Sequence, residues 1–229
     1  MLPRTLEPEV MDTAEEAADY DLMDHSEVNT RFVEDLLDWM LHKNERAGFA
    51  LSGTFLDVGV GTAQIPIELA TRTSTLRIQG IDLAQEMLQL ARRNAVAAQV
   101  SERILLDRVD AKQTGYADAA FDGVISNSIV HHIPEPGFVF AELWRVLKPA
   151  GVFFVRDLLR PETNDQVEHF VATYTAGETP HQQQLFRQSL HAALTVDEIA
   201  DLIAPLGLPR TAVQQTSDRH WTIAALKPA

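Results

Sequence analysis

The sequence predicts an α/β fold: a doubly wound, mostly parallel seven-stranded sheet with helices on both faces and a C-terminal antiparallel strand pair. Between residues 54 and 155, short apolar runs alternate with segments in which apolar residues recur every three or four positions. Strands that alternate with helices form parallel sheets covered on both faces. Since right-handed crossovers align these strands, we expect a ligand crevice at their carboxyl ends.

The strand pattern occupies residues 54–58, 76–81, 104–109, 121–126 and 152–155, followed by two strands within residues 211–228. Helical patterns occupy residues 26–41, 65–70, 84–97 and 139–147, and residues 148–151 break the last of these. Thr195 and Glu198 form a capping-box pattern for a further helix, which Gly207 ends.

Composition limits the partners of this chain. With 33 acidic and 19 basic residues among 229, the formal net charge is −14, which disfavours nucleic acid and anionic membranes and suits a small neutral or cationic substrate. The absence of cysteine excludes disulfides, thiolate metal sites and cysteine nucleophiles. No apolar run approaches the roughly 18–20 residues that span a bilayer, and the N-terminus lacks a secretory signal pattern. We therefore expect a cytoplasmic protein, of undetermined oligomeric state.

The stretch FLDVGVGTAQ, residues 55–64, connects the first strand to a helix. A dinucleotide-binding loop has the pattern G-x-G-x-x-G, but here only Gly59 and Gly61 are present and Gln64 occupies the third position. Asp57 adds a negative charge that disfavours phosphate. A carboxylate beside glycine backbone favours a ligand with positive charge, although a tight turn alone would give the same pattern.

With these residues the sequence resembles the class I S-adenosylmethionine-dependent methyltransferases, whose first motif is an acidic residue followed by x-G-x-G-x-G. DVGVGTA matches it except at Ala63, which we expect to be small enough to keep the next helix close. The resemblance continues through FDGVISNSIVHHI and ELWRVLKPAGVFFV. It implies a Rossmann-like fold, S-adenosylmethionine as cofactor and in-line methyl transfer to a small-molecule acceptor.

The resemblance also implies roles for individual residues. Asp57 and the backbone of Gly59 and Gly61 would hold the methionine end of the cofactor. YDLM, residues 20–23, resembles the Y-D-x-M lid segment of the quinone-biosynthesis C-methyltransferases, so Tyr20 would lie over the cofactor. Asn127, at the end of the fourth strand, is a candidate for the methionine end or the reacting centre.

The adenosine end would meet the next two strand ends. Asp82 can accept hydrogen bonds from the ribose hydroxyls, or cap the helix after it. Leu83 and Met87 would flank the adenine, unless Met87 is ordinary core. Asp110 or the Ala111 backbone would meet the adenine edge, unless Asp110 is a simple loop residue.

His131 and His132 follow Asn127 at the crevice rim. His132 is a weak candidate for a catalytic base, and packing is the favoured role for both histidines. We expect no metal here, because adjacent side chains usually diverge and no further ligand stands at helical spacing. His169, His181 and His191 are expected at the surface.

Four regions follow from this interpretation. We expect residues 1–50 to form an acidic arm and lid helices, and residues 51–157 the cofactor-binding core. Residues 158–193 would be a helical insertion lining the acceptor pocket. Residues 194–229 would supply the last helix and strand pair.

Three other functions remain open: a non-catalytic S-adenosylmethionine-binding regulatory protein, a nicotinamide-dependent oxidoreductase and a transferase acting on protein. Gln64 and Asp57 disfavour the nicotinamide enzyme. Residues 126–129, SNSI, lack the N/D-P-P-Y motif that methyltransferases acting on nucleic-acid amino groups often carry, so nucleic acid is not expected as acceptor.

Overall fold

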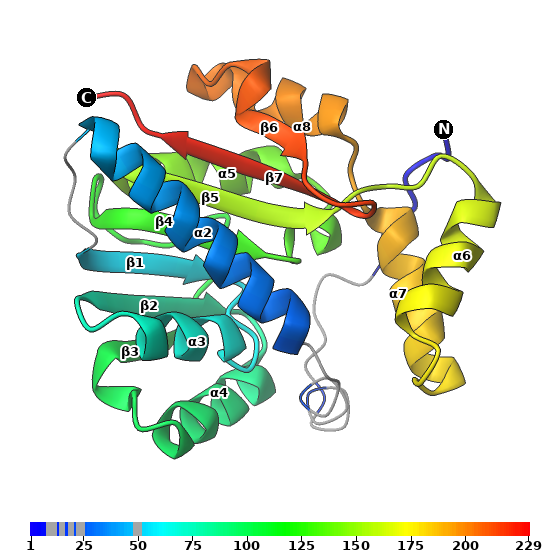
Figure 1. Cartoon of the computed structure of the whole chain (residues 1–229), viewed down its shortest axis with the longest axis horizontal. Helices are drawn as coiled ribbons and strands as arrows, with labels where there is room; N and C mark the ends of the chain where they lie inside the picture. Colours follow the sequence, from blue (N-terminus) through cyan, green and yellow to red (C-terminus); the bar gives the residue numbers. More distant parts are fainter. Residues whose placement is uncertain (8–12, 14–16, 18–20, 22–25, 48–51) are drawn as a thin grey trace.

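The computed structural model describes residues 1–7, 13, 17, 21, 26–47 and 52–229. Its centre is a seven-stranded sheet in the order β3-β2-β1-β4-β5-β7-β6 (Figure 1). The strands are β1 (Gly53–Val58), β2 (Leu76–Asp82), β3 (Ile104–Arg108), β4 (Phe121–Asn127), β5 (Leu147–Leu158), β6 (Val213–Gln215) and β7 (His220–Leu226). The first five pair in parallel, whereas β7 pairs antiparallel with β5 and β6. The predicted Rossmann-like doubly wound sheet with its antiparallel C-terminal pair is therefore confirmed.

Helices cover both faces of the sheet (Figure 1). One face carries α2 (Ser26–Ala47), α3 (Gln64–Arg72) and α4 (Gln85–Ala97), and the other carries α5 (Pro136–Val146) and α8 (Val196–Ile203). Neighbouring residues of one strand serve opposite layers: Phe55 packs with Phe32 and Leu36 of α2, while Leu56 belongs to the core beneath α5 and α8. Strands buried on both faces give the continuous apolar runs seen in the sequence.

Strand β5 is longer than the predicted segment 152–155. It begins at Leu147, directly after α5, and its pairing with β4 shifts register between the Phe121–Leu147 and Gly123–Val152 pairs. Ala150 has φ 59°, a left-handed conformation that accompanies this irregularity. Residues 148–151, which were predicted to break the helix, do follow its end, but they form the irregular first part of β5 and not a separate turn.

Helices α6 (Asn164–Tyr174) and α7 (Pro180–Ala192) lie beyond the carboxyl ends of the parallel strands (Figure 1). They pack on each other through Val167, Phe170 and Leu190, and on Leu158 at the end of β5. Both helices fall inside the segment predicted as a helical insertion, although the division of the chain into four regions stays a prediction.

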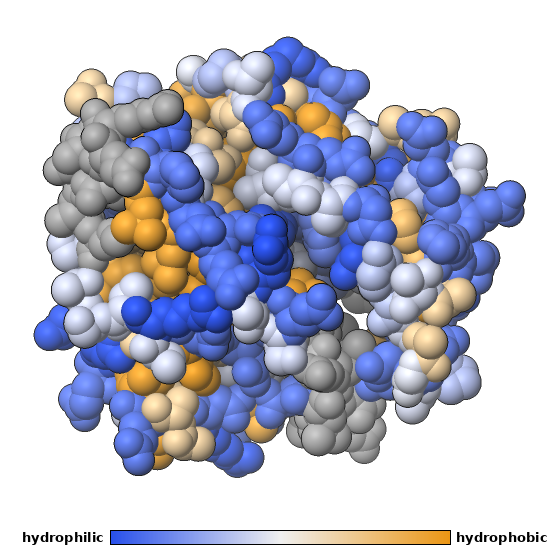
Figure 2. All heavy atoms as spheres, in the orientation of Figure 1, coloured by the Kyte–Doolittle hydropathy of each residue, from blue (hydrophilic) through white to orange (hydrophobic). Residues whose placement is uncertain are grey.

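Hydrophilic side chains cover most of the face seen in Figure 2, and apolar side chains show mainly in gaps between them. Among the described residues, no helix combines the length and apolar character needed to cross a bilayer.

Candidate functional site

The loop after β1 turns sharply through three left-handed residues. Gly59, Gly61 and Ala63 have φ values of 70°, 52° and 64°. Ala63 is fully buried against Leu88 and Ala91 of α4, so its methyl group fits the close approach expected of it. The left-handed conformation nevertheless costs a non-glycine residue roughly 1–2 kcal/mol, a cost that the resemblance alone did not reveal.

The loop is fixed to the neighbouring strand end. The backbone N–H groups of Gly59 and Val60 donate to the Ile81 carbonyl over 2.9 and 3.0 Å. Asp82 then holds two chain segments at once: its Oδ2 accepts from the Gly61 N–H and its Oδ1 from the Ala84 N–H, both at 2.9 Å. Asp82 therefore bonds to Ala84, the residue directly before α4, but the side-chain cap that the helix-cap alternative predicted is not found at this helix end among the described residues. Contact with a ribose stays a prediction.

A first hollow opens on the β2 side of the loop. Eight residues predicted for the site line it: Gly59, Gly61, Asp82, Leu83, Met87, Asp110, Ala111 and His132. The remaining lining residues were not predicted: Ile81, Ala84, Val109, Lys112, Ser128, Ile129 and Ile133. Asp110 Oδ1 accepts from the Lys112 N–H at 2.8 Å, so this carboxylate also shapes its own turn.

A second hollow opens on the other side of the same loop. It shares Gly59 and Gly61 with the first hollow and adds the predicted residues Asp57 and Asn127. Among the described residues, Asn29, Val60, Thr62, Gln64 and Ile65 also line it. Asn127 is brought here by β4, whose Ser126 hydroxyl donates to the Val58 carbonyl at 2.9 Å. Two hollows therefore meet at the glycine loop.

The second hollow presents a buried carboxyl group and two buried oxygen atoms that make no hydrogen bond with any described residue. Burial, and then the charge of Asp82, raises the pKa of the Asp57 carboxyl well above its ordinary value, although the Val58 backbone hydrogen bond opposes the shift. Within the described part of the chain, the buried Asn127 Oδ1 and Thr62 Oγ1 atoms have no hydrogen-bond partner. A carboxyl group and an unpaired amide oxygen suit a ligand that brings a cation and hydrogen-bond donors. These residues fit the ammonium and sulfonium end of S-adenosylmethionine.

Asp21, within the predicted lid segment 20–23, and Ala17, shortly before it, lie against this site. Ala17 is buried with Ala84 and Met87, beside the first hollow. The Asp21 carboxylate accepts from Asn94 Nδ2 at 3.0 Å and from Gln64 Nε2 at 3.4 Å. Tyr20 lies outside the described residues, so its predicted position over the cofactor is untested.

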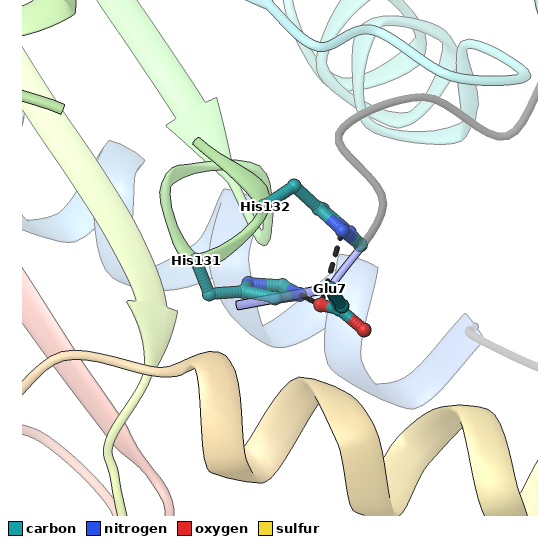
Figure 3. A group of neighbouring side chains, drawn as sticks. All are labelled: Glu7, His131 and His132. Atoms are coloured by element: carbon teal, nitrogen blue, oxygen red, sulfur yellow. Dashed lines mark ion pairs between the residues drawn. The ribbon is translucent and has the colours of Figure 1, made fainter. Parts of the chain in front are cut away.

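A compact polar cluster lies next to the first hollow, around the turn η2 (Val130–His132) (Figure 3). The expectation that the adjacent histidines diverge is wrong, because their ring centroids are 4.0 Å apart. Glu7 Oε1 lies 3.5 Å from His131 Nε2 and 3.1 Å from His132 Nδ1. His131 Nδ1 lies 2.5 Å from Asp157 Oδ1.

Burial and the neighbouring charged groups shift the pKa values of the two histidines of the cluster in opposite directions. Burial alone would lower the pKa of His131, but Asp157 and Glu7 outweigh burial and raise it. Burial and the neighbouring His131 lower the pKa of His132, although Glu7 acts in the opposite direction. His169 and His181 are exposed, as expected, and His191 is half-buried. None of these three histidines belongs to the cluster.

Sequence reasoning missed Glu7, Asp157 and Asn29 because each reaches the site from a distant segment. Asp157 carries the clearest available signal, a carboxylate near the end of a buried parallel strand. Glu7 carries none, because it is one of many acidic residues in the N-terminal segment. No residue of α6 or α7 lines either hollow, so their predicted contact with an acceptor remains open.

Comparisons with known proteins relate the central part of this chain to methyltransferases. Residues 56–155 match the sequence profile of a family described as "Methyltransferase domain". A ubiquinone/menaquinone biosynthesis C-methyltransferase of Geotalea daltonii is 28% identical over 124 residues, which cover 54% of this chain and 53% of that protein. A demethylmenaquinone methyltransferase of Deinococcus radiodurans is 40% identical over 96 residues, covering 42% of this chain and 39% of that protein.

A solved S-adenosylmethionine-dependent methyltransferase from Methanococcus maripaludis superposes with a TM-score of 0.67 at 18% identity, over 98% of each chain, and so shares the fold. The matched part of this chain spans about half or less of the length of the two curated relatives.

Proposed function

We propose that this chain, whose residues 56–155 form a class I S-adenosylmethionine-dependent methyltransferase domain, transfers a methyl group from that donor to a small-molecule acceptor. The observation that carries the proposal is the pair of hollows meeting at Gly59 and Gly61. One is acidic and presents unpaired oxygens, and the other is lined by apolar residues beside Asp82. A ligand with a cationic amino-acid end and an adenosine end has this same polarity.

In this proposal each hollow holds one end of the donor. Asp57 and Asn127 Oδ1 receive the ammonium group, and the main chain of residues 59–61 lies against the methionine part. The Asp82 carboxylate, at the end of β2 in the first hollow, accepts from the ribose hydroxyls. Leu83 and Met87 flank the adenine, while the Asp110–Ala111 backbone meets its polar edge.

The bound donor would supply a methyl group already activated by a positively charged sulfur. The protein must therefore chiefly orient the acceptor in line with that methyl group and exclude water. His132 lines the first hollow, and its lowered pKa keeps the imidazole neutral, as a base requires. Asn127, at the second hollow, would orient rather than deprotonate, because an amide does not titrate.

A small molecule is the acceptor class best supported. The net charge of −14 opposes binding of nucleic acid, and both curated relatives are named for steps in quinone biosynthesis. Because the matches cover only 53% and 39% of those relatives, a quinone acceptor is not carried over to this chain.

The first test is calorimetric titration with S-adenosylmethionine, S-adenosylhomocysteine and NAD. Binding of the first two with no binding of NAD is the expected result, and the reverse would establish the nicotinamide alternative.

Incubation with labelled donor and fractionated metabolites should then give a labelled small product. The Asp57→Asn variant is the matched control and should give far less product. Donor binding without transfer to any fraction would favour the regulatory alternative, and label on protein would favour a protein acceptor.

A further inference from the structure

The geometry points to a binding site for a divalent transition-metal ion of the zinc class, formed by Glu7, His131 and His132 beside the first hollow. One carboxylate oxygen and two imidazole nitrogens lie within 4.8 Å of one another (Figure 3). Two imidazoles and one carboxylate form a donor set that binds zinc in proteins and leaves a further coordination position open. The site does not depend on the proposed methyl transfer.

The separations between the donor atoms agree with shared coordination. Two ligands about 2.0–2.2 Å from a tetrahedral ion lie roughly 3.3–3.5 Å apart. Glu7 Oε1 lies 3.5 Å from His131 Nε2 and 3.1 Å from His132 Nδ1. Both distances from Glu7 Oε1 are close to this range, and all three donor atoms lie within 4.8 Å of one another.

Two of these atoms are buried without a hydrogen bond. Among the described residues, Glu7 Oε1 and His132 Nδ1 are 3.1 Å apart, but their orientation does not make a hydrogen bond. The side chain of Glu7 is 7% exposed and that of His132 is 18% exposed, but both of these atoms are themselves buried. A buried carboxylate oxygen that accepts no hydrogen bond is costly unless a cation meets it.

Neighbouring groups already orient two of the ligands. Asp157 Oδ1 faces His131 Nδ1, which turns Nε2 of the same ring toward Glu7. Ser189 of α7 donates its hydroxyl hydrogen bond to Glu7 Oε2 over 3.3 Å, which leaves Oε1 to face the histidines. Carboxylate support behind a ligating histidine is characteristic of metal sites, and its removal typically costs about 10–100-fold in affinity.

The local charges permit a divalent ion. Glu7 and the fully buried Asp157 contribute two negative charges. Arg4 opposes them, since its guanidinium donates to the His131 carbonyl at 3.1 Å and the Ile133 carbonyl at 2.9 Å. Arg4 also anchors the N-terminal segment here, so an ion would bind where residues 1–7 are already held against η2 and α7.

The test uses the full chain without a histidine tag, stripped with a chelator and titrated with Zn²⁺ by calorimetry and with Co²⁺ by visible absorption. We expect one equivalent of Zn²⁺ and the intense d–d bands of Co²⁺ in a low-coordinate site. Glu7→Gln and His132→Gln should each weaken Zn²⁺ binding by at least about tenfold, and Asp157→Asn by about 10–100-fold. The matched control His181→Gln removes an exposed histidine on α7 and should bind like the wild type.

Failure of the wild-type protein to bind Zn²⁺ would overturn the site and would indicate that protons, rather than a metal, bridge the cluster. Equal affinity in the wild type and in folded Glu7→Gln and His132→Gln variants would overturn it too, by placing the ion elsewhere. Should these variants not fold, the wild-type Co²⁺ spectrum decides, because a spectrum of hydrated Co²⁺ contradicts the site. S-adenosylmethionine binding, measured separately, distinguishes this failure from failure of the proposed function.

Discussion

At the scale of single residues, the role that we propose for Asp57 links its charge state to binding of the donor. Its pKa is raised well above the ordinary value, first by burial and then by Asp82. A cation bound beside a carboxylate favours the charged form and so lowers the carboxyl pKa. If Asp57 holds the donor as we propose, the protein would release a proton on binding at pH values between the carboxyl pKa of the bound protein and the raised pKa of the free protein.

We predict that affinity for S-adenosylmethionine rises with pH until the pKa of Asp57 in the free protein is passed, and then levels off. Calorimetry in buffers with different ionisation enthalpies should detect the released proton. Asp57→Asn has no proton to release, so its binding should be weaker and its enthalpy independent of the buffer. Proton release that is equal in the variant and the wild type would assign the effect to another group.

Asp82 combines a ligand role, which we propose, with a structural role, which the hydrogen bonds to Gly61 and Ala84 demonstrate. We predict that Asp82→Ala weakens S-adenosylmethionine binding by at least about tenfold, because charged hydrogen bonds typically contribute about 1.5–3 kcal/mol each. Asp82→Asn keeps one acceptor oxygen and should lose less. The measurement is titration calorimetry, with thermal unfolding recorded in parallel. Unchanged affinity in Asp82→Ala would contradict contact with the ribose.

Most of the predicted residues that line the two hollows belong to a strand end or to the loop after it, and Met87 lies in the first turn of α4. Asp57, Asp82 and Asn127 could be placed because the carboxyl ends of parallel strands meet at one edge. Glu7 could not be placed in this way, since nothing in the local sequence indicates that the N-terminal segment returns to η2. The backbone conformation of Ala63 could not be predicted either. The sequence shows alanine where the motif has glycine, but it does not show that this alanine keeps the left-handed conformation.

At the scale of secondary-structure elements, the β1–α3 connection depends on glycine for two separate reasons. Gly59 has φ 70°, and a Cβ atom on it would lie 2.3 Å from Cδ1 of Ile129. Gly207, after α8, also has a left-handed φ of 78°, but a Cβ there would meet nothing within 4 Å. An alanine at Gly207 would therefore add backbone strain alone, whereas an alanine at Gly59 would add both backbone strain and a steric clash.

We predict that Gly207→Ala costs about 1 kcal/mol of unfolding free energy and leaves donor binding intact, because only backbone strain is added. Gly59→Ala should destabilise the protein more and abolish measurable donor binding, since Ile129 and the loop must both move. Denaturant unfolding and calorimetry give the two quantities. Normal donor affinity in a folded Gly59→Ala variant would show that the loop does not approach the ligand closely.

The order and type of the elements followed from periodicity, because buried parallel strands and amphipathic helices leave different repeats in the sequence. The limits of β5 did not, since Leu147 ends an apolar helical stripe and also starts a strand. The position of α6 and α7 beyond the strand ends depends on packing against Leu158 and the N-terminal segment, which no local pattern encodes.

At the scale of the whole molecule, the net charge of −14 produces a field that attracts cations. S-adenosylmethionine has a net charge of +1, because its sulfonium and ammonium groups exceed its one carboxylate. S-adenosylhomocysteine has lost the sulfonium charge and is neutral overall. The two ligands have almost the same shape and so make similar contacts once bound. A difference between their association rates therefore reports the attraction of the charged ligand by the field.

We predict that the association rate constant of S-adenosylmethionine falls by roughly tenfold between about 0.01 M and 1 M salt, as the screening length shortens from about 30 to 3 Å. The rate constant for S-adenosylhomocysteine should change little, because a neutral ligand gains nothing from the field. Stopped-flow fluorescence or surface plasmon resonance measures both rates. An equal salt dependence for the two ligands would mean that salt acts on the opening of the site. In that case the acidic composition would favour solubility without guiding the donor into the hollow beside Asp57.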